Sequence, residues 1–224
     1  MSAKPPLRLA VLISGRGSNM TAIVRACLAG AIAARPVIVI ADRPQAAGLA
    51  SAASLGVATA TVAAGTGAGA GAPFEQQLGE TLAAAQPDFV ALAGFMRVLS
   101  AAFVARYAGR MLNIHPSLLP AYRGLHTHRR VLAAGERVHG ASVHFVTAEL
   151  DGGPVVLQST LAVQPGDTAA TLAARVQATE HIIYPRALGW FAQGRLAWHD
   201  NAAWLDGQRL KAPVVEDFGA AVRG

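Results

Sequence analysis

The sequence predicts one α/β domain, with an open, mostly parallel, twisted sheet and helices on both faces. Short apolar runs alternate with helical patterns through the first half of the chain. Two consecutive β-rich runs in the second half predict an antiparallel edge. The 224 residues are 53% hydrophobic and 14% charged, a balance that supports a packed core and excludes a disordered chain.

The elements of the first half follow from short patterns bounded by turn residues. LRLAVLI at 7–13 is a buried strand, and the helix over 20–30 has Gly30 as its stop. The Ala/Gly-rich segment 63–73 predicts a mobile surface loop. Further strands are predicted at 36–41, 57–62, 88–94 and 110–114, and further helices at 45–56, 74–86 and 101–109.

The second half predicts an antiparallel pair over 140–163, joined at Asp151-Gly-Gly-Pro. A long amphipathic helix follows over 167–194, with Asp167 or Thr168 as its cap and Pro185 as a site where it could kink. Residues 195–210 predict a small hairpin, and the tail over 211–224 is expected to be loose. No repeat or linker divides the chain, so 1–224 is expected to be one domain.

Charge and cysteine content limit the classes of function. The net charge of +6 is dispersed, and Arg129-Arg130 is interpreted as a solvated helix face, so no nucleic-acid partner is expected. Cys27 is the only cysteine, which excludes an intrachain disulfide. No run suits a signal peptide or a membrane span, so a cytoplasmic protein without a membrane partner is expected. His126 and His128 lack a third ligand at a suitable spacing, and no metal is expected.

The segment SGRGSNM joins the first strand to the first helix. Helix N-termini present unpaired N–H groups, so Gly17, Ser18 and Asn19 are candidate phosphate ligands. A dinucleotide fingerprint would need glycine where Met20 stands, although Asp42 could act as its ribose-binding acid. A nicotinamide enzyme is therefore the weaker alternative, and a plain strand-to-helix turn remains open.

Asn113 and His115 end a predicted strand immediately before a proline. Two residues apart, they face the same side, where an amide and an imidazole can stabilise an oxyanion. Asp151 is the candidate carboxylate that favours the imidazolium form of His115, because the two glycines beside it let the backbone approach closely. His144 is interpreted as a core or edge residue and Glu180 as a solvated helix position. A capping His-Pro and an ordinary Asp-Gly turn remain the structural alternative.

Over about residues 7–210, the chain resembles the phosphoribosylglycinamide formyltransferases of purine biosynthesis, which have a Rossmann-like fold. The resemblance rests on long stretches in the family's order: VLISGRGSN, PDFVALAGFMRVLS, YAGRMLNIHPSLLPAYRGLHTHRRVL, HGASVHFVTAELDGGPVVLQ, QATEHIIYP and NAAWLDGQRL. It implies formyl transfer from 10-formyltetrahydrofolate to the amine of glycinamide ribonucleotide. It also implies a phosphate-binding half over about 1–100, a folate and catalytic half over about 101–210, and a monomer or weak homodimer.

The resemblance also implies roles for individual residues. Asn113 and His115 would act on the formyl carbonyl, with Asp151 tuning the histidine. Glu180 would contact the ribonucleotide, whose phosphate would be bound by Gly17, Ser18 and Asn19. The folate site would comprise Met96, Arg97, Val98, Leu99 and Asn113.

Two departures from the family pattern concern basic residues. None stands in 65–73, where Gly71 falls about where the family has an arginine, and another is missing near Ala121, where Arg123 could substitute. Methionyl-tRNA formyltransferase and formyltetrahydrofolate hydrolase use similar chemistry, but each carries an extra domain that this chain length disfavours. A catalytically silent nucleotide-binding module is the alternative outside enzymes.

Overall fold

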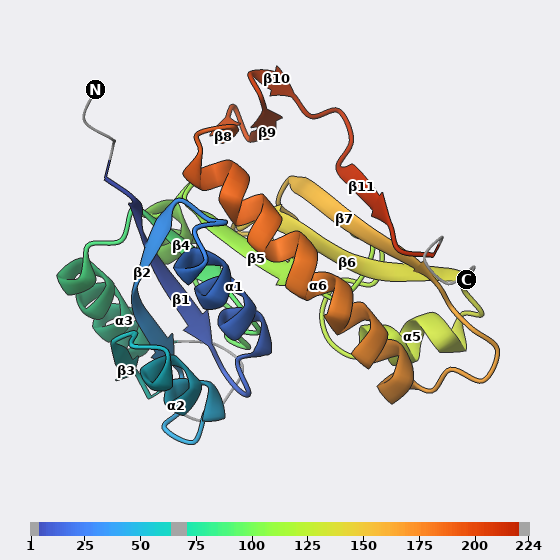
Figure 1. Ribbon diagram of the computed structural model, residues 1–224, viewed down its shortest axis with the longest axis horizontal. Coiled ribbons are helices and arrows are strands. Elements are labelled where there is room, and N and C mark those ends of the chain that lie inside the picture. The colour runs from blue at the N-terminus through green and yellow to red at the C-terminus, as the bar shows by residue number, and fades with distance from the viewer. Residues whose placement is uncertain (1–4, 64–70, 220–224) are drawn as a thin grey trace.

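The computed structural model describes residues 5–63 and 71–219 (Figure 1). Within these ranges eight strands form one sheet, in the order β11-β7-β6-β5-β4-β1-β2-β3. The strands of this sheet are β1 (Leu7–Ile13), β2 (Ala34–Ala41), β3 (Thr59–Thr61), β4 (Phe89–Leu92), β5 (Met111–His115), β6 (Val138–Phe145), β7 (Val155–Ala162) and β11 (Val214–Asp217). Among these strands β6 alone runs against the others, which confirms the mostly parallel sheet and its antiparallel C-terminal part.

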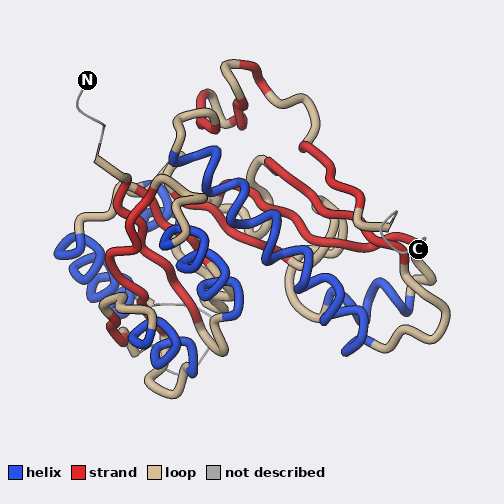
Figure 2. The backbone as a smooth tube through the Cα atoms, in the orientation of Figure 1, coloured by secondary structure: helices blue, strands red, loops and turns tan. Residues whose placement is uncertain are grey.

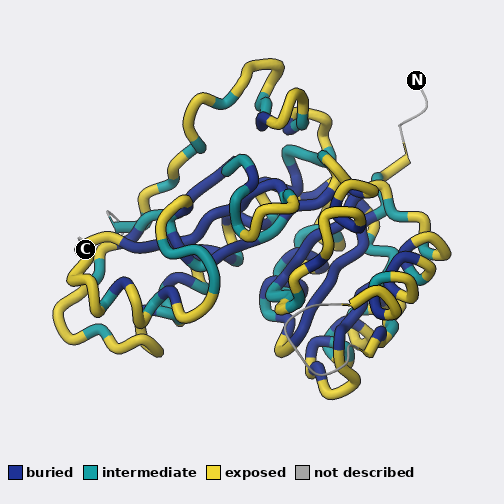
Figure 3. The backbone as a smooth tube through the Cα atoms, turned by 180° about the vertical axis from the view of Figure 1, so that it is seen from behind, coloured by how far each residue is buried: buried dark blue, intermediate teal, exposed yellow. Residues whose placement is uncertain are grey.

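Helices cover both faces of this sheet (Figure 2). The helices are α1 (Ser18–Leu28), α2 (Ala47–Ser54), α3 (Ala72–Ala85), α4 (Ala101–Ala105), α5 (Thr127–Ala133) and α6 (Ala169–Ala192). Residues of α1, α2 and α6 belong to one buried cluster, and residues of α3 and α4 to another. Strand β1 alternates between the two clusters, with Val11 in the first and Leu12 in the second. Burial on both faces explains why this strand is a continuous apolar run (Figure 3).

The long helix α6 packs across the sheet and ties two of its strands together. Thr168 caps its start, as predicted, through a reciprocal pair of hydrogen bonds with Thr171, and the helix continues through Pro185. Tyr184 is fully buried, and its hydroxyl lies 3.0 Å from the carbonyl oxygen of Leu92 and 2.9 Å from that of Leu112. The hydroxyl donates between the carboxyl ends of β4 and β5, where candidate site residues follow.

Replacing Tyr184 with phenylalanine is expected to reduce the free energy of unfolding by about 1–3 kcal/mol, because the buried carbonyl oxygens lose their donor. In a chain of this size the melting temperature should fall by roughly 2–4 °C per kcal/mol, measured by calorimetry. Tyr107→Phe is the control, because the Tyr107 hydroxyl has no hydrogen-bond partner in the described part of the chain. Equal melting temperatures for the two variants would refute the bridging role.

The C-terminal region is more ordered than expected. Strands β8 (Leu196–His199), β9 (Ala202–Leu205) and β10 (Gln208–Arg209) form the predicted hairpin with one further strand. The expectation of a loose tail is wrong for β11, which pairs in parallel with β7. Val214 packs against the main core, and Arg186 of α6 forms an ion pair with Glu216. This run is too short to reveal periodicity, and its partners lie far away in sequence.

Three further findings concern the limits of the fold. In the described ranges, no helix is long and apolar enough to cross a membrane. Residues 64–70 of the predicted Ala/Gly-rich loop lie outside those ranges. Arg129 and Arg130 lie on α5 and are exposed, as expected of a solvated helix face.

Candidate active site

The strand order creates a natural binding edge. The chain adds β2 and β3 on one side of β1 and then returns to place β4 and β5 on the other side. The loops after β1 and β4 therefore separate, and open α/β sheets bind ligands at this point, beyond the carboxyl ends of the strands. The glycine loop, the segment after β4 and the end of β5 all lie at this edge.

The glycine loop has a geometry that side chains would disrupt. Gly17 precedes α1 with φ +72°, a conformation that L-residues rarely adopt. The α2 residue Gly48 packs against it, since a Cβ on Gly17 would lie 2.9 Å from the Gly48 Cα. No side chain caps the start of α1. Ser18 and Asn19 open the helix, so its first N–H groups face the edge where an anion can bind.

A cavity of about 350 Å³ opens in front of this helix start. Its lining includes the three predicted phosphate ligands, Gly17, Ser18 and Asn19, together with Met96, Gln177 and Glu180. We call it the anion cavity. The structure thus brings all four predicted ribonucleotide contacts to one cavity.

Glu180 is not the solvated helix residue that its local sequence indicates. It is 7% exposed, and its Oε2 accepts a hydrogen bond of 2.7 Å from the Asn19 Nδ2. Burial raises the pKa of this carboxyl, although the bond from Asn19 acts in the opposite direction. The Asn19 Oδ1 is buried without a hydrogen-bond partner among the described residues. The Glu180 carboxyl group therefore lines the anion cavity and is linked to the helix start through Asn19.

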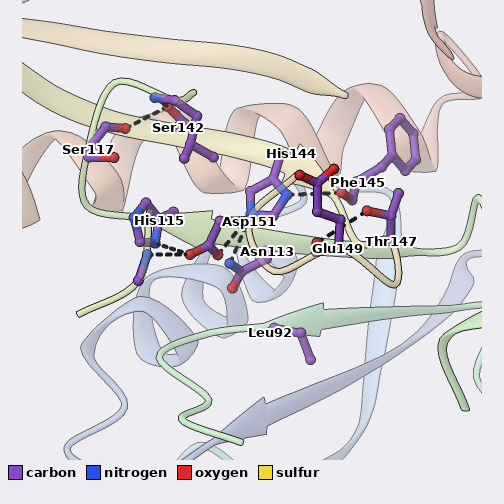
Figure 4. Close-up of polar contacts among 12 residues, drawn as sticks. Leu92, Asn113, His115, Ser117, Ser142, His144, Phe145, Thr147, Glu149 and Asp151 are labelled. Atoms are coloured by element: carbon purple, nitrogen blue, oxygen red, sulfur yellow. Dashed lines mark hydrogen bonds and ion pairs between the residues drawn. The ribbon is translucent and has the colours of Figure 1, made fainter. Parts of the chain in front are cut away.

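Strand β5 presents Asn113 and His115 side by side, as the period of a strand requires (Figure 4). The His115 Nδ1 lies 3.4 Å from the Asp151 Oδ2, and its Nε2 lies 3.1 Å from the carbonyl oxygen of Tyr122. Both ring nitrogens thus face acceptors, which is the arrangement that a doubly protonated imidazolium satisfies. His115 is 6% exposed, so its ring is largely shielded from solvent.

Asp151 is held at the turn after β6, as the sequence predicts. Its Oδ2 also accepts a 2.9 Å hydrogen bond from the Gly124 N–H, so the carboxylate links two loops. A Cβ on Gly153 would lie 1.9 Å from the carbonyl oxygen of Phe145, so the turn approaches β6 more closely than any side chain would permit. The predicted role of the flanking glycines in close backbone approach holds at Gly153.

His144 has a role that the sequence alone did not reveal. It is opposite Asn113 in the antiparallel pair, and its Nε2 lies 3.0 Å from the Asn113 Nδ2. The His144 Nδ1 donates to the carbonyl oxygen of Phe145, so Nε2 is the acceptor. Burial lowers the pKa of His144 to about 4 despite the nearby Asp151. A neutral His144 therefore orients the Asn113 amide. In the sequence, the only indication of this role was that His144 and Ser142 alternate along the strand and so face the same side.

A second, smaller cavity of about 80 Å³ lies beside this cluster. Arg97, Val98, Leu99, Asn113 and Asp151 are among its lining residues. We call it the folate-side cavity, after the resemblance. Met96, predicted with this group, lines the anion cavity instead, because its backbone N–H donates to the Ser14 Oγ and holds it toward β1.

Other sequence candidates have different roles. Arg123 forms an ion pair with Glu149 and lines neither cavity, which argues against its serving as the substitute near Ala121. Gly71 also lines neither cavity and precedes α3. Asp42 is enclosed by guanidinium groups and is unsuited to accept from a ribose hydroxyl.

The His126-x-His128 motif does not form a paired site. His126 is exposed at the start of α5, whereas the His128 Nδ1 lies 3.0 Å from the His139 Nε2. Burial lowers the pKa of His128, with the charge of His115 as a smaller cause. Burial also lowers the pKa of His139 to about 4, with the charges of His128 and His115 as smaller causes. One neutral imidazole thus donates to the other. In the described ranges no three His, Cys, Asp or Glu side chains gather as metal ligands.

Comparison with known proteins gives consistent results. A family model described as formyl transferase matches residues 7–188. The phosphoribosylglycinamide formyltransferase of Escherichia coli K12 is 52% identical over 204 residues, covering 91% of this chain and 96% of its own length. The Haemophilus influenzae enzyme of the same name is 41% identical, covering 91% and 95%.

The likeness extends to solved structures. The phosphoribosylglycinamide formyltransferase of Coxiella burnetii, solved with CHES, has a TM-score of 0.87 and 47% identity, and the match covers 94% of this chain and 99% of that one. A formyltetrahydrofolate deformylase from Pseudomonas syringae has a TM-score of 0.82 at 22% identity, which shows a common fold alone. From the family match and the identity to full-length relatives, the chain belongs to the formyl transferase family.

Proposed function

We propose that the protein transfers the formyl group of 10-formyltetrahydrofolate to the amine of 5′-phosphoribosylglycinamide. The products are formylglycinamide ribonucleotide and tetrahydrofolate, a step of purine biosynthesis. The observation that carries the proposal is the position of Asn113 and Asp151, at the folate-side cavity and next to His115. The names of the full-length relatives identify the same reaction.

The anion cavity would bind the ribonucleotide. Its phosphate would accept from the N–H groups at Gly17, Ser18 and Asn19, where the helix dipole favours negative charge. The Glu180 carboxylate lines the other side of this cavity and would accept from a donor on the same substrate. This arrangement would leave the reacting amine directed toward Asn113 and the end of β5.

The folate-side cavity would take the pterin end of the co-substrate. Arg97, Val98 and Leu99 line it together with Asn113. Met96, on the boundary toward the ribonucleotide, would separate the two substrates. Both cavities are lined by one chain, which is compatible with action as a monomer or a weak homodimer. We expect the cytoplasm to be the location of this biosynthetic step.

The chemistry would follow from the Asn113, His115 and Asp151 cluster. The amine nitrogen attacks the formyl carbon, the N–C bond forms, and the carbonyl oxygen becomes an oxyanion. The Asn113 amide and the His115 imidazolium donate to that oxygen, which takes the place of the Tyr122 carbonyl as acceptor from His115. The bond to the folate nitrogen then breaks, and the proton lost by the amine reaches that nitrogen. Each oxyanion donor supplies roughly 3 kcal/mol of barrier reduction.

The Glu180→Gln variant is expected to change both the KM for the ribonucleotide and the pH dependence of protein stability. The KM for the ribonucleotide is expected to rise about tenfold, because a charged acceptor becomes neutral. The raised pKa of Glu180 means that its contribution to stability is present at low pH and is lost as pH rises through the folded-state value. The variant should therefore gain stability relative to the wild type as pH increases. Steady-state kinetics and urea unfolding at two pH values measure both effects.

The control is Glu80→Gln, an exposed carboxylate on α3 that pairs with Gln76. It should leave the KM and the pH dependence of stability unchanged. An unaltered ribonucleotide KM in Glu180→Gln would contradict the placement of this substrate.

The proposed function is tested by formyl transfer with purified protein. The protein is mixed with 10-formyltetrahydrofolate, with and without the ribonucleotide, and release of tetrahydrofolate, formate and formylated product is followed. Turnover that requires the ribonucleotide and yields equal amounts of tetrahydrofolate and formylated product supports the transferase. Release of formate without the ribonucleotide would identify a hydrolase, and binding without turnover would identify a silent nucleotide-binding module.

A further inference from the structure

A buried carboxylate, Asp42, pairs with one arginine from the lining of each cavity. It follows β2 at the same sheet edge as the site, and it is 1% exposed. The Arg43 Nε lies 3.1 Å from the Asp42 Oδ1, and the Arg97 Nε lies 2.7 Å from the Asp42 Oδ2. The Ser14 hydroxyl also contributes to lowering the pKa of this carboxyl group. Neither the phosphate loop nor the catalytic cluster explains this group.

The two guanidinium groups lead to different cavities. Arg43 lines the anion cavity, and its side chain is 47% exposed there. Arg97 lines the folate-side cavity, and its side chain is only 13% exposed. Asp42 itself lines neither cavity. One carboxylate thus holds a cation at each substrate site.

A second connection runs through the backbone. The Ser14 Oγ accepts a 2.8 Å hydrogen bond from the Met96 N–H. The Ser14 N–H in turn donates to the carbonyl oxygen of Gly94. Ser14, whose hydroxyl also contributes to the lowered pKa of Asp42, therefore holds the start of the segment 95–99, which supplies the wall of the folate-side cavity.

The charges of this cluster allow Asp42 to stay ionised and paired with both guanidinium groups. Burial alone would raise the pKa of Asp42, but hydrogen bonds from Arg43, Arg97 and Ser14 outweigh it, and the pKa lies below its usual range. The carboxylate is therefore charged at neutral pH. Two guanidinium groups against one carboxylate leave a net positive charge, which favours the anionic groups of both substrates.

We propose that Asp42 is a positioning residue that sets both substrate sites at once. Through Arg43 it places a cation at the rim of the anion cavity, and through Arg97 it fixes the segment 95–99 at the folate-side cavity. The identity of the two ligands rests on the proposed function. The distinctive consequence is that one substitution, at a residue that lines neither cavity, weakens the binding of both ligands.

The test measures binding without turnover. Ribose 5-phosphate probes the anion cavity and 5-formyltetrahydrofolate the other, each titrated by calorimetry into the full chain. Asp42→Asn should weaken the binding of both probes about five- to tenfold. Arg43→Gln should weaken the binding of ribose 5-phosphate alone, and Arg97→Gln should weaken the binding of 5-formyltetrahydrofolate alone. These two variants therefore test the proposal even if Asp42→Asn fails to fold.

The control variant is Asp206→Asn. Asp206 also accepts two hydrogen bonds from one guanidinium, that of Arg195, at 2.7 Å each, but it lines neither cavity. It should leave both affinities unchanged. A folded Asp42→Asn protein that loses affinity for one probe alone, or for neither, would overturn the inference. A wild-type protein that binds both probes without formyl transfer would refute the proposed function and leave this comparison valid.

Discussion

Replacing His115 with alanine is expected to lower kcat for formyl transfer by about three orders of magnitude. The imidazole is the one group of the cluster that can both donate to the oxyanion and release a proton. Its two nitrogens face Asp151 and the carbonyl oxygen of Tyr122, so it is held in place before substrate arrives. The KM values should change little, because His115 lines neither cavity.

The comparison requires a histidine that plays no part in the site. His199→Ala alters an exposed ring at the end of β8 and should retain full activity. Steady-state rates with both substrates saturating measure the effect, and circular dichroism verifies folding. A His115→Ala protein that keeps more than about a tenth of the wild-type kcat would remove this residue from the chemical step.

Replacing Asp151 with asparagine is expected to lower kcat by about a hundredfold. The variant keeps an amide of the same shape, and asparagine tolerates the φ of +48° found there. It loses the negative charge that faces the His115 Nδ1 at 3.4 Å, whereas its amide oxygen can still accept from the Gly124 N–H. The His115 ring then faces a neutral amide in place of a carboxylate.

The decisive readout is again kcat at saturating concentrations of both substrates, compared with the wild type. Asp217→Asn is the matched control, since this carboxylate accepts from Thr160 and from the Gly219 N–H on the far edge of the sheet. A kcat for Asp151→Asn within threefold of the wild-type value would show that the carboxylate serves only to order the loop.

Much of the fold and of the cluster could be predicted because the signals are local. Strands β1, β2, β4 and β5 each contain an apolar run bounded by turn residues, and Asn113 and His115 are one strand period apart. Asp151 was predicted from its glycines, and Gly153 does approach the β6 backbone closely.

The interpretation of His144 as a core residue is confirmed, but the surroundings of several residues depend on distant partners. Glu180 looks solvated within α6, yet its partner Asn19 is 161 positions earlier. His144 gains its role from register with Asn113, which only the sheet pairing reveals. Met96 lines the anion cavity, and its N–H donates to Ser14, which lies 82 positions earlier. The tail was expected to be loose because β11 has no sequence pattern of its own. It forms a strand because it pairs with the free edge of β7.

The most direct test of the central claim is the crystal structure of the ternary complex with the ribonucleotide and a non-reactive folate analogue. The account predicts the phosphate at the start of α1 and the pterin beside Val98 and Leu99. The amine should lie roughly 3–3.5 Å from the carbon corresponding to the formyl group, with Asn113 and His115 directed at its oxygen. A folate analogue bound elsewhere, or an amine directed away from β5, would contradict it.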